Sequence, residues 1–122
     1  MRLRKPKAKS KTPIHPGDIW MIRDGESNRL KMVLVLKVQG TVLVSEIRYD
    51  HVTMSPNEIV HFNWVNSGLG KKSVIYIANT FRKKKSDFER KNSRVTREEL
   101  SNAWDAYVKF SSQDSNLEAV EG

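Results

Sequence analysis

The chain contains no cysteine, and this absence excludes several kinds of chemistry. Without thiols there can be no disulfide framework, no cysteine-ligated zinc and no thiol nucleophile. No run of about 18 apolar residues occurs either, so we expect no transmembrane helix. The basic N-terminus is not followed by the apolar stretch of a signal peptide, which favours a cytoplasmic over a secreted protein.

Metal ligands and nucleotide-binding loops are also scarce. The three histidines, His15, His51 and His61, are scattered along the chain and have no cysteine partners, so they do not predict a metal site. The segment from Gly68 to Lys72 is too short for a phosphate-cradling loop and follows no buried strand. We therefore expect neither a metal nor another cofactor.

A length of 122 residues is typical of one domain, which we divide into three parts. Residues 1–13 form a basic arm with few apolar side chains, which we expect to be disordered. Residues 14–110 form the folded domain. Residues 111–122 form a mildly acidic tail that we also expect to be disordered.

Positive charge is concentrated in two blocks. Residues 2–11 carry six lysines and arginines and no acid, and residues 82–97 carry eight against two acids. The net charge of the two blocks together is +12 and that of the whole chain is +8, so the remainder is mildly acidic. Such segregation is typical of proteins that bind a polyanion. A solubilising arm with a solvated loop is the alternative, while a membrane surface is disfavoured because no broad apolar helix face accompanies the arm.

Apolar runs between turn residues predict a mainly β fold, a small barrel of about five strands. Pro16-Gly17 is a turn that feeds the first strand, and Gln39-Gly40 is a compact turn between the second and the third. We expect strands at residues 17–22, 31–38, 41–49, 58–62 and 73–78.

An amphipathic helix is predicted at the C-terminal end of the domain. Thr96 and Glu99 have the spacing of a capping box, in which each side chain satisfies a free backbone amide. We expect the helix to end near Phe110 and to pack on the barrel. Its apolar face would consist of Leu100, Ala103, Trp104, Tyr107 and Val108.

Several short motifs occur in an informative order. The chain has Gly17-Asp18-Ile19-Trp20, then Lys31-Met32-Val33-Leu34-Val35-Leu36, then Ser67-Gly68-Leu69 before two lysines, and finally Lys85-x-Asp87-Phe88-x-Arg90-Lys91. In this order they resemble motifs of the PemK/MazF family of growth-inhibiting toxins. The likeness covers roughly residues 16–108.

This resemblance implies a barrel of Src-homology-3 type, usually dimeric, that binds single-stranded RNA and is paired with an antitoxin. Members of the family cut RNA without a metal ion, because the 2′-hydroxyl of the RNA attacks the neighbouring phosphate. The family's helpers are an arginine of the Arg-Pro motif and a threonine or serine near the end of the third strand.

The chain departs from the family pattern at both catalytic places. Lys31-Met32 stands where the family has Arg-Pro, and Arg48-Tyr49 stands where it has the hydroxyl residues. We therefore take Lys31 and Arg48 as the candidate catalytic residues, with Arg29 as a substitute if the alignment shifts. Tyr49 is placed to stack on an exposed base.

The predicted nucleic-acid contacts combine these residues with the two basic blocks. Contacts of this kind reach phosphates without reading sequence, so RNA and DNA both remain open as ligands. The predicted residues are Arg29, Lys31, Arg48, Tyr49, Lys83, Lys84, Lys85, Arg2, Arg4, Lys5 and Lys7.

Three functional hypotheses follow. The first is a nucleic-acid-binding protein on a PemK/MazF-like barrel whose catalytic centre is degenerate or rebuilt. The second is a metal-independent endoribonuclease toxin of a toxin–antitoxin pair. The third is a protein-interaction module that acts on the transcription or translation machinery. Whether the protein is an enzyme stays open at this point, as does its assembly into a homodimer.

Overall fold

The computed structural model describes residues 12–25, 27–49 and 55–121. For residues 113–121 it describes the backbone alone. Strands dominate this part of the chain, and one long helix follows them. The elements are β1 (Asp18–Asp24), β2 (Arg29–Gln39), β3 (Thr41–Arg48), the short helix η2 (Pro56–Glu58), β4 (Ile59–His61), β5 (Val74–Lys83), the short helix η3 (Lys85–Asp87), β6 (Phe88–Arg94) and α1 (Arg97–Glu121).

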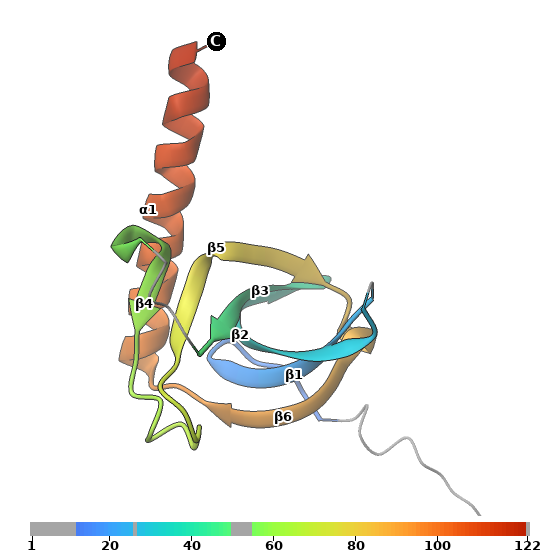
Figure 1. Ribbon diagram of the computed structural model, residues 1–122. Coiled ribbons are helices and arrows are strands. Elements are labelled where there is room, and N and C mark those ends of the chain that lie inside the picture. The colour runs from blue at the N-terminus through green and yellow to red at the C-terminus, as the bar shows by residue number, and fades with distance from the viewer. Residues whose placement is uncertain (1–11, 26, 50–54, 122) are drawn as a thin grey trace, which may run out of the picture.

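The strands form one antiparallel sheet in the order β4-β5-β3-β2-β1-β6. The sheet curls into a barrel that does not close, so β4 and β6 are its edges (Figure 1). The first part of α1 packs at one side, against β5, β4 and β2, and the helix then projects past the sheet (Figure 1). The predicted mainly β fold with a C-terminal helix is confirmed.

The central strand β3 is buried on both of its faces. Successive side chains of a strand point to opposite sides. Leu43 and Ile47 therefore belong to the apolar cluster that contacts α1, whereas Val42 and Val44 belong to a second cluster around Trp20. This burial fixes the register of β3, because a slip of one residue would exchange the two sets.

The Gly-Asp-Ile-Trp motif ties the start of β1 to two other elements. Gly17 has φ +94°, its N–H donates to the carbonyl of Val35 at 2.8 Å, and its own carbonyl accepts from the N–H of Val95 at 2.9 Å. Asp18 is fully buried and accepts from the N–H of His15 at 2.9 Å and the indole of Trp20 at 3.4 Å. The motif thus joins β1 to β2 and to the segment that leads into α1.

Two elements differ from the sequence predictions. The described residues form six strands, because Phe88–Arg94 pairs with β1 although Phe88 is its one buried residue. An edge strand rich in exposed charge carries little of the apolar pattern by which strands are recognised. The helix was expected to end near Phe110, but α1 continues to Glu121. No proline or glycine interrupts this stretch, so nothing in the backbone stops the helix.

The predicted basic arm, residues 1–13, falls almost entirely outside the described residues. Within the part of the chain that the structure describes, no helix is long and apolar enough to cross a membrane.

Candidate nucleic-acid-binding groove

The groove arises where β2 and β3 separate. The last paired residues of these two strands are Val33 and Glu46. Beyond them β2 stays with β1, where Lys31 is the partner of Ile22, and β3 stays with β5, where Arg48 is the partner of Val74. The ends of β2 and β3 are thus held by different neighbours and form two opposing walls.

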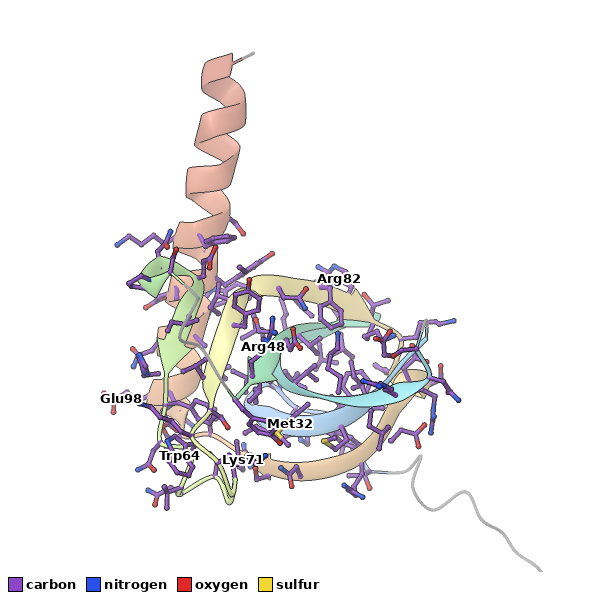
Figure 2. The ribbon with its side chains drawn as sticks, in the orientation of Figure 1. Met32, Arg48, Trp64, Lys71, Arg82 and Glu98 are labelled. Carbon is purple, nitrogen blue, oxygen red and sulfur yellow. The ribbon has the colours of Figure 1, made fainter. Side chains whose placement is uncertain are left out.

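Between these walls lies an open groove of about 610 Å³, which we call the β2–β3 groove. Figure 2 labels one residue of each wall, Met32 on β2 and Arg48 on β3. Four residues predicted from the sequence, Arg29, Lys31, Arg48 and Tyr49, belong to this one lining. The full lining is Met21, Asp24, Ser27, Arg29, Leu30, Lys31, Met32, Glu46, Ile47, Arg48 and Tyr49.

Aromatic rings and one carboxylate contact two of the cationic side chains of the groove, Lys31 and Arg48. The guanidinium of Arg48 lies 5.3 Å from the centre of the Tyr76 ring, and the ammonium of Lys31 lies 5.6 Å from that of Phe81. Lys31 also reaches the Asp24 carboxylate at 4.0 Å. Cation–π contacts are worth about 0.5–1 kcal/mol at exposed sites, enough to bias a side chain without immobilising it.

Tyr49 stands at the rim of the groove and is 49% exposed. The ammonium of Lys71, from the connector before β5, lies 5.0 Å from the centre of its ring. A half-exposed ring beside cations is a suitable surface for a nucleobase, since base stacking on aromatic side chains is worth about 1–3 kcal/mol.

A bulge in β5 places a polar side chain against Glu46, which lines the groove. Ser45 pairs with Thr80 while the next residue, Glu46, pairs with Tyr76, so β5 carries extra residues at this point. Among them is Asn79, whose amide donates to Oε1 of Glu46 at 2.8 Å. Bulges of this kind often re-aim side chains next to active sites.

The hydroxyls beneath the groove are already engaged. Thr80 donates to the carbonyl of Ile77 at 2.7 Å, which leaves Ser45 as the donor in its 2.6 Å hydrogen bond to Thr80. Ser45 is fully buried. These hydroxyls therefore stabilise the bulge and do not replace the hydroxyl residues of the PemK/MazF pattern.

A second hollow of about 410 Å³ adjoins the groove, and the two linings share Asp24 and Lys31. This side hollow contains Lys83, one of the predicted contacts, and Arg82, which the sequence interpretation did not include. Lys83 is paired with Asp87 at 3.4 Å. Figure 2 labels Arg82 on β5.

The remaining predicted contacts are not brought together with the groove. Lys84, just before η3, and Lys85, its first residue, are exposed and belong to neither lining. Arg2, Arg4, Lys5 and Lys7 lie outside the described residues.

Sequence reasoning missed Glu46 and Asn79. Glu46 was visible as an acid within a predicted strand, on the same face as Arg48. Asn79, however, follows directly after the predicted end of its strand, and no local pattern indicates the bulge that turns it toward Glu46. No group of three or more metal-ligating side chains occurs among the described residues.

Solved structures resemble this architecture, although no protein-family model and no curated protein sequence matches the chain. One is an endoribonuclease in complex with its cognate antitoxin from a mycobacterial species, with a TM-score of 0.64 and 12% identity over 80% of this chain and 93% of that one. Another is the Mycobacterium tuberculosis toxin MazF-mt6, with a TM-score of 0.59 and 19% identity over 74% of this chain and 91% of that one. The chain has a PemK/MazF-like fold.

At these identities the likeness concerns the fold, and the groove must be judged on its own residues. The PemK/MazF-like fold supplies the sheet whose β2 and β3 separate. Lys31, Arg48 and Glu46 are the residues that this chain places in that frame.

Proposed function

We propose that the protein is an endoribonuclease toxin that binds single-stranded RNA in the β2–β3 groove and cleaves it. The observation that carries this proposal is the meeting of Arg29, Lys31 and Arg48 with the half-exposed Tyr49 in one groove. The PemK/MazF-like fold, which is also the fold of an endoribonuclease, supports it.

The proposed nucleophile is the 2′-hydroxyl of the RNA itself. Its attack on the adjacent phosphate gives a 2′,3′-cyclic phosphate and releases the 5′-hydroxyl of the next nucleotide. The phosphorane that forms on the way carries extra negative charge, which Lys31 and Arg48 stabilise from opposite walls. The planar guanidinium of Arg48, placed over Tyr76, is suited to binding two phosphate oxygens at once.

DNA is expected to bind but to remain uncut, because it lacks the 2′-hydroxyl. Its phosphates meet the same cations, and its bases stack on Tyr49 in the same way. The proposal therefore separates binding, which both nucleic acids share, from cleavage, which requires RNA.

A second candidate function is RNA binding without cleavage. Lys31-Met32 and Arg48-Tyr49 stand in place of the Arg-Pro and hydroxyl residues of the pattern that the sequence resembles. The hydrogen-bonded, buried Ser45 does not replace the lost hydroxyl. These observations favour a site that binds the phosphates of RNA but does not catalyse its cleavage.

We also propose a protein antitoxin as partner, because one solved relative of the fold is in complex with its cognate antitoxin. A partner that covers Arg29, Lys31 and Arg48 would need acidic side chains to match them. Assembly of the chain into a homodimer stays a prediction.

The test is incubation of the purified protein with end-labelled single-stranded RNA and with DNA of the same sequence, each with and without EDTA. We expect RNA fragments that end in a 2′,3′-cyclic phosphate and a 5′-hydroxyl, intact DNA, and no effect of EDTA. Arg48→Ala and Lys31→Ala should each lower kcat by about 100- to 1,000-fold, since each removes one donor to the developing charge.

Arg90→Ala is the matched control, because it removes an exposed arginine of β6 that does not line the groove. It should leave kcat unchanged. Salt-sensitive binding of RNA that is never cut would establish the second candidate instead. Absence of both binding and cleavage would overturn both candidates and favour a protein-interaction module.

A further inference from the structure

The β2–β3 groove contains carboxylates as well as cations, and the two carboxylates differ in the contacts that they make. Two described residues of its lining, Asp24 and Glu46, carry a carboxylate. Phosphate binding alone gives no reason for an acid in such a groove, because a carboxylate repels the ligand that the cations attract. Cleavage of RNA does give a reason, because the 2′-hydroxyl must lose its proton as it attacks.

Asp24 is already committed to structural contacts. One of its oxygens, Oδ2, accepts from the hydroxyl of Ser27 at 3.1 Å and faces the ammonium of Lys31 at 4.0 Å. These contacts fasten the turn between β1 and β2 and hold Lys31. A carboxylate with this role is poorly placed to accept a further proton during the reaction.

Glu46 is held in a different way. It is half-buried on the β3 wall, on the same face of the strand as Arg48, and lies where β2 and β3 separate. The Asn79 amide donates to its Oε1 at 2.8 Å, and the β5 bulge provides that amide. A neutral donor fixes the orientation of the carboxylate without cancelling its charge. This arrangement is the one that an oriented general base requires.

We propose that Glu46 is the general base of the reaction and that Asn79 is its positioning residue, an inference that rests on the proposed function. Oε2 of Glu46 takes the proton of the 2′-hydroxyl while the 2′-oxygen forms its bond to phosphorus. The bond from phosphorus to the 5′-oxygen breaks, and the ammonium of Lys31 gives that oxygen a proton. Both side chains then return to their starting states by proton exchange with water.

The isosteric variant Glu46→Gln tests the proposal, because its amide oxygen can still accept from Asn79 while it cannot take up the proton. We expect kcat to fall by about 100-fold or more, the range of general base catalysis. Binding of a 2′-O-methyl RNA, which cannot be cut, should be unchanged or tighter, because a negative charge has left the groove. A merely structural role would instead weaken both.

The pH dependence of kcat/KM gives a second readout. General base catalysis requires an unprotonated base, so the wild-type protein should lose activity toward acid pH, and this acidic limb should be absent from the residual activity of Glu46→Gln. Glu46→Asp keeps a carboxylate, so it should cleave more slowly than the wild type but show the same loss of activity toward acid pH. This variant also tests the proposal if Glu46→Gln does not fold. The other charged or titratable side chains that face this site are Asp24, Arg29, Lys31, Arg48, Tyr49 and Tyr76.

Asn79→Ala should lower kcat less than Glu46→Gln does and should leave binding of the 2′-O-methyl RNA intact. Glu98→Gln, at an exposed acid of α1 labelled in Figure 2, is the matched control and should change neither quantity.

Three results would overturn the inference. If the wild-type protein cuts RNA and Glu46→Gln cuts it equally fast with the same pH profile, the base is another group and the proposed function still stands. If Glu46→Gln changes which sequences are cut while kcat is kept, Glu46 reads a base instead of moving a proton. If the wild-type protein leaves no cyclic phosphate ends, both the proposed function and this inference are wrong.

Discussion

At the scale of single residues, Asp18 is a buried carboxylate on which donors from separate segments converge. Besides the N–H of His15 and the indole of Trp20, the ammonium of Lys91 on β6 lies 3.5 Å from its Oδ1. The acid of the Gly-Asp-Ile-Trp motif therefore has a structural role, since it joins β1 to its neighbour β6 and to the turn before it.

We expect Asp18→Ala to lower the free energy of unfolding by about 1–3 kcal/mol, because it leaves buried donors without an acceptor. Urea denaturation followed by circular dichroism measures this change. Asp105→Ala, at an exposed position of α1, should stay within about 0.5 kcal/mol of the wild type. Equal stability of the two variants would contradict the structural role of Asp18.

Gly17 also has a structural role, which its backbone conformation explains. A side chain at its φ of +94° is strained, and a Cβ there would also meet Leu100 at 3.6 Å. Gly17→Ala should therefore lower the melting temperature and cost more than about 1 kcal/mol. Gly25→Ala is the matched control, since nothing lies within 4 Å of its Cβ position. A smaller loss at Gly17 than at Gly25 would contradict this explanation.

The residues of the candidate site were predictable to different degrees. Lys31 and Arg48 came from the resemblance to the PemK/MazF family, and the structure brings them into one lining with Arg29 and Tyr49. Their roles stay predictions. The contact between Glu46 and Asn79 could not be predicted, because it depends on a bulge between strands that lie far apart in the sequence.

At the scale of elements, the start of α1 carries the clearest local determinant. The Glu99 N–H donates to the hydroxyl of Thr96 at 3.1 Å, and the Thr96 N–H donates to the Glu99 carboxylate at 2.9 Å. The predicted capping box is confirmed. Of the predicted apolar face, Ala103 is buried and Leu100, Trp104 and Tyr107 pack on the core, whereas Val108 is 44% exposed.

Thr96→Ala should lower stability by about 0.5–2 kcal/mol, the usual cost of losing such a cap. Thermal unfolding followed at 222 nm measures it. Ser101→Ala removes a hydroxyl from an exposed position further along the same helix and should cost nothing or stabilise slightly. If the two variants behave alike, the cap does not contribute to stability.

The strands that the sequence predicted well are those with their own apolar pattern, β1 to β5. Only Phe88 is buried in β6, which obtains its place by pairing with β1. The pairing of β6 with β1 cannot be predicted from a short stretch of sequence, because the two strands lie far apart along the chain. The helix end was missed for the opposite reason, since its polar composition indicated disorder while its backbone continues as helix to Glu121.

At the scale of the whole molecule, the net charge of +8 leads us to expect that the proposed binding of RNA weakens as the salt concentration rises. For single strands, the logarithm of the association constant falls with a slope of about −0.7 per phosphate contacted. Arg48→Ala should therefore flatten the slope by about 0.7, measured by anisotropy with a labelled 2′-O-methyl RNA. Lys109→Ala, an exposed lysine of α1 outside the groove, should leave the slope unchanged. Equal slopes for wild type and Arg48→Ala would place the bound phosphates elsewhere.

The edges of the sheet are also a property of the whole molecule. β4 spans only Ile59–His61, and β6 exposes Arg90 and Lys91. A short edge and a charged edge both discourage pairing with the strands of another chain. The sheet can therefore remain open without offering a long apolar edge to another chain.

The order of strands in the sheet also affects how the protein folds during its synthesis. The walls of the β2–β3 groove belong to strands that follow one another along the chain, so their pairing closes short loops, which costs little entropy. The pairing of β1 with β6 joins Ile19 to Ser93, and long-range pairings of this kind slow folding. As the chain leaves the ribosome, β1 and β2 can pair first, whereas the β3 wall is completed only when β5 arrives, because Arg48 pairs with Val74. We therefore expect a nascent chain that ends before β5 to lack the groove, although both of its cationic segments have already been made.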